Sequence, residues 1–134
     1  MRVTWRAVEL RLLLPILVLV PLGFAITNIA LQSQLDPGPL GLAIGYVSMF
    51  LAAHVFLVLS GHRGDQLILP AVGAMGGIGL IMLNRLPQEL AGTSAFGIEL
   101  GMVATQLLWF GIGLVVMLAI AIGLRDDGVL RHYK

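Results

Sequence analysis

The chain of 134 residues contains no cysteine, which excludes disulfide bridges and thiolate metal sites and leaves its redox compartment open. Charge is also scarce: Asp, Glu, Lys and Arg together make up 11% of the residues, against about 25% in a typical soluble protein. So few charges cannot coat a water-facing surface. Most of the chain is therefore expected to have lipid as its solvent.

The chain also lacks a basic patch and the common catalytic motifs. Its net charge is +1, with the basic residues scattered, so no nucleic-acid partner is expected. Gly-x-Ser-x-Gly, His-Glu-x-x-His and Walker sequences do not occur. The Asp126–Asp127 pair has no second acidic cluster, and His62 with Asp65 would supply only two metal ligands. No catalytic residue, cofactor site or metal site is predicted.

Hydrophobic residues, in contrast, make up 58% of the chain, and the mean hydropathy is +0.97. They form four runs without formal charge, at 12–35, 40–60, 66–84 and 100–124. The 19 residues of the third run would reach roughly 28 Å as a helix, close to the ~30 Å hydrocarbon thickness of a bilayer. Backbone polar groups in lipid need internal partners, which favours helices. The sequence predicts an all-α, polytopic membrane protein with four transmembrane helices.

Basic residues predict the orientation. Seven of the eight lie in the tail 1–11, the turn 61–66 and the segment 125–134, whereas the two other connections hold only Arg85. The positive-inside rule then places both termini in the cytoplasm, with 32–39 and 86–98 outside. The tail 1–11 would carry Glu9, and 32–39, which ends with two prolines around a glycine, is interpreted as a turn. A cleaved signal peptide is the alternative for the first run, but that run is long for one, and further spans follow.

Glycines in the third span predict a helix-packing seam. Small residues four apart let membrane helices approach closely, and this pattern occurs in spans two, three and four. The seam is predicted at five glycines: Gly73, Gly76, Gly77, Gly97 and Gly101. A dinucleotide-binding loop is the alternative, but the glycine order does not fit and no strand precedes it.

Three side chains are candidate polar contacts inside the membrane: His54, Gln106 and Trp109. His54 lies within the second span, where an ionisable group is a functional candidate. A hydrogen-bonded packing role is favoured for it, because no acidic residue is expected at a similar depth. Gln106 and Trp109 are one helical turn apart, and both are interpreted as packing residues, with Gln106 joining the fourth span to the third.

Several segments in the second half carry a family resemblance: Asp65–Pro70, Gly77–Met82 leading to Arg85–Pro87, Gln106–Trp109 with Gly111, and Leu130–Lys134. Together they resemble the start of the FtsW/RodA/SpoVE (SEDS) family of cell-wall proteins. On this resemblance, 65–124 would be the family's first two helices and 125–134 a cytoplasmic loop. Residues 12–60 would be an extra amino-terminal helix pair, as in longer members.

The resemblance implies a multi-pass protein of the bacterial cytoplasmic membrane that polymerises lipid II with a class B penicillin-binding protein, in elongation or division. The family's essential acidic residue lies in a loop of its second half, which no position here matches. The chain is thus interpreted as an amino-terminal scaffold fragment without the catalytic loop. The alternatives are a stand-alone four-helix subunit that binds other membrane proteins and, less favoured for want of a membrane-embedded carboxylate, a small multidrug exporter.

Overall fold

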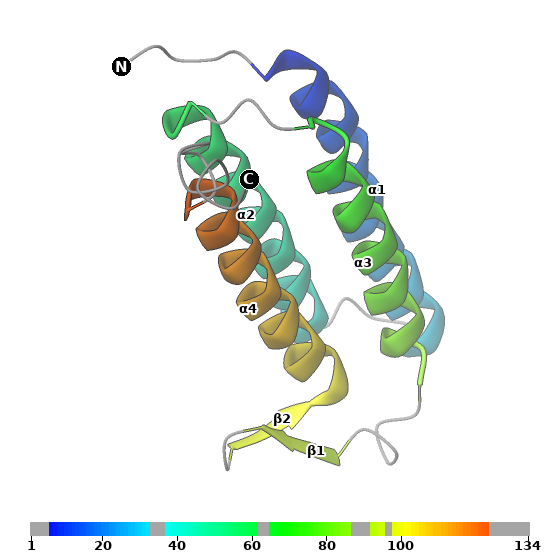
Figure 1. The fold of residues 1–134 in the computed structure, drawn as a ribbon. Coiled ribbons are helices and arrows are strands. Elements are labelled where there is room, and N and C mark those ends of the chain that lie inside the picture. Colours follow the sequence, from blue (N-terminus) through cyan, green and yellow to red (C-terminus); the bar gives the residue numbers. More distant parts are fainter. Residues whose placement is uncertain (1–5, 33–36, 62–64, 87–91, 96–97, 124–134) are drawn as a thin grey trace.

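The computed structural model describes all residues except 1–5, 33–36, 62–64, 87–91, 96–97 and 124–134. Four helices follow one another in antiparallel order, with a short hairpin before the last (Figure 1). The elements, listed in chain order, are α1 Ala7–Gln32, α2 Pro37–Leu59, α3 Ile68–Asn84, β1 Gly92–Ala95, β2 Ile98–Gly101 and α4 Met102–Gly123. This confirms the all-α architecture of four apolar helices.

Two helices begin earlier than the sequence predicted. Helix α1 starts at Ala7 rather than residue 12, so Glu9 belongs to its first turn and not to a tail. Helix α2 starts at Pro37, so the prediction that the turn 32–39 includes Pro37–Gly38–Pro39 is wrong, while 33–36 lie outside the described residues. Prolines are tolerated there because N–H groups in a first turn have no partner within the helix.

Three helices are long and apolar enough to cross a membrane: α1, α2 and α4. Helix α3 has 17 residues and spans about 25 Å, somewhat less than the hydrocarbon core. Its composition is equally apolar, with one polar residue, Asn84, at its end. The chain is therefore a multi-pass membrane protein, built from three full-length helices and one shorter helix.

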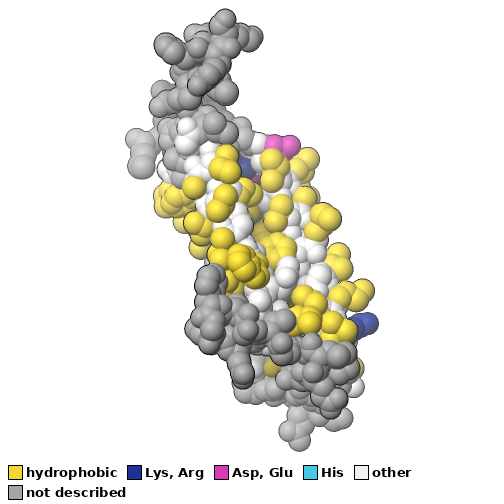
Figure 2. All heavy atoms as spheres, turned by 60° about the horizontal axis from the view of Figure 1, so that its bottom comes forward, with side chains coloured by type: hydrophobic (Ala, Val, Ile, Leu, Met, Phe, Trp, Pro, Cys, Tyr) yellow, Lys and Arg dark blue, Asp and Glu magenta, His cyan; other side chains and the backbone are white. Residues whose placement is uncertain are grey.

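The core lies along seams with three- and four-residue spacing. Its buried residues are Leu13, Leu17, Val20 and Phe24 on α1, Ala43, Tyr46, Phe50, Ala53 and Leu57 on α2, Leu69 and Leu80 on α3, and Leu114 on α4. This spacing keeps one stripe of each helix turned toward its neighbours, as in coiled-coil packing. Many large hydrophobic side chains outside these stripes are exposed, and hydrophobic side chains are visible along the helices in Figure 2. Such a surface suits contact with lipid.

A hydrogen bond at the centre of the bundle joins α2 to α3. The hydroxyl of Tyr46, which is fully buried, donates to the carbonyl oxygen of Gly73 at 2.5 Å. The Tyr46 ring also lies 4.8 Å from the Phe50 ring, measured between centroids. Because Gly73 has no side chain, the aromatic residues of α2 can approach the backbone of α3 directly.

Replacing Tyr46 with phenylalanine is expected to lower the unfolding free energy by about 0.5–1.5 kcal/mol, the usual net value of one hydrogen bond. The ring and its packing would remain. Ser48→Ala is the matched control, because the exposed Ser48 hydroxyl bonds only within its own helix, to the Gly45 carbonyl. Unfolding in mixed detergent micelles would measure both, and equal stabilities of the two variants would contradict the expectation.

A two-stranded antiparallel hairpin, for which no strand was predicted, lies between α3 and α4. Strand β1 pairs with β2 so that Gly92 lies opposite Gly101, Thr93 opposite Leu100 and Ser94 opposite Glu99. The hairpin lies at the end of the bundle opposite the start of α1 (Figure 1). Strand β2 leads into α4 without a break, which fixes where α4 begins.

Candidate functional site

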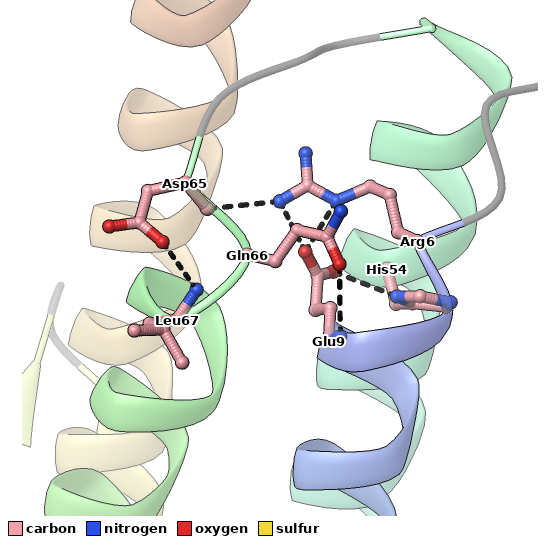
Figure 3. Close-up of polar contacts among 6 residues, drawn as sticks. All are labelled: Arg6, Glu9, His54, Asp65, Gln66 and Leu67. Atoms are coloured by element: carbon pink, nitrogen blue, oxygen red, sulfur yellow. Dashed lines mark hydrogen bonds and ion pairs between the residues drawn. The ribbon is translucent and has the colours of Figure 1, made fainter.

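A buried charged cluster occupies the end of the bundle where α1 begins and α2 ends. It consists of Arg6, Glu9 and His54, whose exposed fractions are 4%, 0% and 8%. Arg6 precedes the first residue of α1, Glu9 lies in its first turn, and His54 comes from the last turns of α2 (Figure 3). Polar side chains this well buried require partners, and the cluster supplies them.

The Glu9 carboxylate divides its two oxygens between the other two residues. Its Oε2 accepts from the Arg6 guanidinium, which approaches through both Nε and Nη2. Its Oε1 lies 2.7 Å from Nδ1 of His54. Since a carboxylate paired with arginine is an acceptor, Nδ1 carries the hydrogen of this bond. Each oxygen of the buried carboxylate is thereby satisfied.

The same cluster also holds the start of α3. Arg6 Nη2 donates to the carbonyl oxygen of Asp65 at 3.1 Å, and the backbone N–H of Glu9 donates to Oε1 of Gln66 at 3.4 Å (Figure 3). The Asp65 side chain turns the other way and accepts from the backbone N–H of Leu67 at 2.9 Å. A first-turn N–H of α1 is thus capped by a residue that precedes α3. Three helices meet through one set of polar contacts.

The expectation that no acidic residue lies at the depth of His54 is therefore wrong, because Glu9 is its partner. The small multidrug exporter was disfavoured because no carboxylate was expected within the membrane. Glu9 lies in the first turn of α1, so that argument does not hold in its original form. Both oxygens of this carboxylate are, however, already bonded, one to Arg6 and the other to His54. Among the described residues, no three His, Cys, Asp or Glu side chains gather as a metal site.

The contact of Glu9 with His54 could be predicted from the sequence only if the ends of α1 and α2 were predicted correctly. His54 lies five residues before the end of α2, or roughly 7.5 Å along the axis. Glu9 is the third residue of α1. In antiparallel neighbours these two positions are nearly level. The prediction that the first helix starts at residue 12 concealed this match.

Three of the five predicted seam glycines lie in α3 and face other helices. A Cβ atom at Gly73 would lie 3.2 Å from the Phe50 ring, and one at Gly77 would overlap Val20 of α1. A Cβ atom at Gly76 would overlap the Phe110 ring of α4. Helix α3 therefore uses its glycines against all three other helices. Whether this seam governs assembly in a membrane stays a prediction.

Of the other two predicted seam glycines, the structure describes one. Gly101 ends β2, and a Cβ atom there would meet no other atom within 4 Å. Gly97 falls outside the described residues. Among the described members of the predicted seam, the three in α3 pack against other helices, whereas Gly101 ends β2 directly before α4.

Gln106 and Trp109 lie on an open groove between α3 and α4. Gln106 is exposed, and its side chain makes no hydrogen bond to another described residue, so the predicted link to α3 is not formed within this part of the chain. Trp109 is 53% exposed. The groove includes a cavity of about 690 Å³ that Gly76, Gly79 and Gln106 help to line. Only 6% of the apolar span of α4 is buried, against 33% for α1 and α2.

Comparison with known proteins identifies a curated relative. The chain is similar to the peptidoglycan glycosyltransferase RodA of Mycobacterium leprae (strain TN), with 29% identity over 93 residues. The match takes in 69% of this chain but only 20% of the relative, so the chain spans about a fifth of that protein's length. No family model matches, and no solved structure matches. A match of 93 residues is longer than 65–134, so it includes residues before Asp65.

Proposed function

We propose that this chain is the amino-terminal membrane scaffold of a SEDS-type peptidoglycan glycosyltransferase in the bacterial cytoplasmic membrane. The observation that carries the proposal is the similarity to RodA over 93 residues, which extends beyond the helix pair α3–α4 into the first half of the chain. The whole protein would polymerise lipid II with a class B penicillin-binding protein. The described residues would position helices and take no part in the chemistry.

The geometry supports a scaffold role. The buried charged side chains of the described residues bond to one another, which leaves none of them aimed at an open substrate site. The open groove between α3 and α4 presents Gln106 beside glycines, where an additional membrane helix could pack and hydrogen-bond. We place the end with the charged cluster on the cytoplasmic side and the hairpin outside, in line with the basic residues.

The same groove also favours a second candidate, a stand-alone four-helix subunit. In that case the additional helix would belong to another membrane protein. The two candidates differ in whether the chain that fills the groove is encoded by the same reading frame.

The test begins by sequencing the native reading frame past the codon for Lys134. If it continues into further apolar spans and a large outside loop with an acidic residue, the purified product is expected to polymerise fluorescent lipid II. A stop codon after Lys134, or a long product without polymerase activity, would contradict the proposal. The stop codon would favour the stand-alone subunit.

A variant can then test the groove. Gly79→Phe should leave the stability of the 134-residue chain unchanged, because no atom lies within 4 Å of a Cβ at Gly79. In the full product it should displace the packed helix and lower the yield of active enzyme. Gly41→Phe is the matched control on α2: its Cβ position is equally open, and Gly41 lines neither of the cavities between α3 and α4. Equal yields for both variants would count against a helix in this part of the groove.

A further inference from the structure

A separate cavity of about 300 Å³ lies between α1 and α2, beside the charged cluster and away from the α3–α4 groove. It is a half-open trough. Its lining includes Arg6, Leu10, Arg11, Leu14, His54 and Val58. With Ala7, the aliphatic members on α1 run along about two turns, or roughly 10 Å. The trough therefore combines an aliphatic lining with two arginines.

The two arginines of the lining differ in their contacts. The Arg6 guanidinium is committed to Glu9 and to the Asp65 carbonyl oxygen. Arg11 is exposed, and no ion pair joins it to another described residue. Neither Glu9 nor Asp65 lines the trough, and the charge of Arg6 is balanced by Glu9, so the positive charge that the lining offers to a ligand is that of Arg11. An anion would complement this lining.

The position of Arg11 indicates where that anion comes from. Arg11 lies within the apolar span of α1, about 6 Å from its first residue, and neighbouring Leu14 is 50% exposed on the surface. An arginine at this depth faces lipid rather than bulk water and extends its guanidinium toward the lipid phosphates. A soluble anion would gain no favourable contact from the aliphatic lining, whereas the acyl chain of a lipid would.

We propose that this trough binds one anionic phospholipid. The phosphate would pair with the guanidinium of Arg11, with the positive charge of Arg6 nearby. One acyl chain would lie along Leu10 and Leu14 against Val58. A negatively charged headgroup is favoured over a zwitterionic one, because the latter would bring another cation beside Arg11. The site does not depend on the proposed enzyme family.

The test is native mass spectrometry of the full chain released from micelles that contain either phosphatidylglycerol or phosphatidylcholine with the same acyl chains. One retained phosphatidylglycerol per protein is expected, and no retained phosphatidylcholine. Arg11→Gln should weaken the retention about fivefold, the effect of roughly 1 kcal/mol per arginine near a membrane surface. Leu14→Trp, which keeps both arginines but fills the trough, should abolish it.

Arg85→Gln is the matched control, because Arg85 is exposed at the far end of α3 and its replacement removes the same charge. Equal weakening by Arg11→Gln and Arg85→Gln would reveal general charge attraction and overturn the site. Retention that survives Leu14→Trp would overturn it as well. Soluble glycerol phosphate should not compete; competition would show that the anion alone binds and would refute an acyl chain in the trough.

Discussion

Replacing Glu9 with alanine is expected to lower the unfolding free energy by about 3–5 kcal/mol, the loss typical of breaking a buried ion pair by removing one partner. Arg6 would remain 4% exposed and charged, with its main partner gone. His54 would lose the acceptor for Nδ1. The measurement is the unfolding midpoint in mixed micelles followed by circular dichroism.

Asp65→Ala is the matched carboxylate control. Its side chain is exposed and accepts a hydrogen bond from the Leu67 N–H. The expected loss of unfolding free energy is therefore about 1 kcal/mol or less. Adding Arg6→Met to Glu9→Ala should restore part of the lost stability, because the uncompensated charge is then removed too. Equal losses for the two carboxylate variants, or no recovery in the double variant, would show that the buried pair contributes little.

The second large effect is expected at Gly77. A single added methyl group, Gly77→Ala, would overlap the Val20 side chain, which is 4% exposed and cannot move into open space. Overpacking of this kind costs about 1–3 kcal/mol, and Gly77→Ile should cost more. Unfolding of the 134-residue chain measures both.

Gly79→Ala is the matched control, two residues along the same helix. Nothing lies within 4 Å of its Cβ position, and alanine is the better helix former, so stability should stay the same or rise slightly. If Gly77→Ala were as harmless as Gly79→Ala, close contact of α1 with α3 would not contribute to stability, and the predicted seam would be abandoned.

The helices could be predicted because charge-free runs of membrane length leave the backbone few alternatives in lipid. Their ends could not be predicted in the same way. Pro37 and Pro39 disrupt helix interiors but fit a first turn, and sequence alone does not show which case applies. The sequence of the hairpin strands lacks an alternation of apolar and polar residues strong enough to indicate strands. The pairing of β1 with β2 is therefore seen only in the structure.

The candidate site was harder to predict than the fold. Arg6 and Glu9 are spaced to pair within one helix, so that contact is local. The contact of Glu9 with His54 joins residues 45 apart, and the contact with Gln66 joins residues 57 apart. Both depend on how the helices align in space. For the glycines, in contrast, the pattern identified the packed face of α3 but not that Gly101 would lie in a hairpin.

The cap on Glu9 has a consequence for the order of events during synthesis. Its N–H partner, Gln66, is translated 57 residues later, which at about 5–20 residues per second is a delay of about 3–11 seconds. During that interval the Glu9 carboxylate can pair with Arg6 and, once it has been made, with His54, but the Glu9 N–H has no glutamine to bind. The first turn of α1 therefore stays uncapped until the ribosome delivers the start of α3, and only then does this end of the bundle reach its final set of contacts.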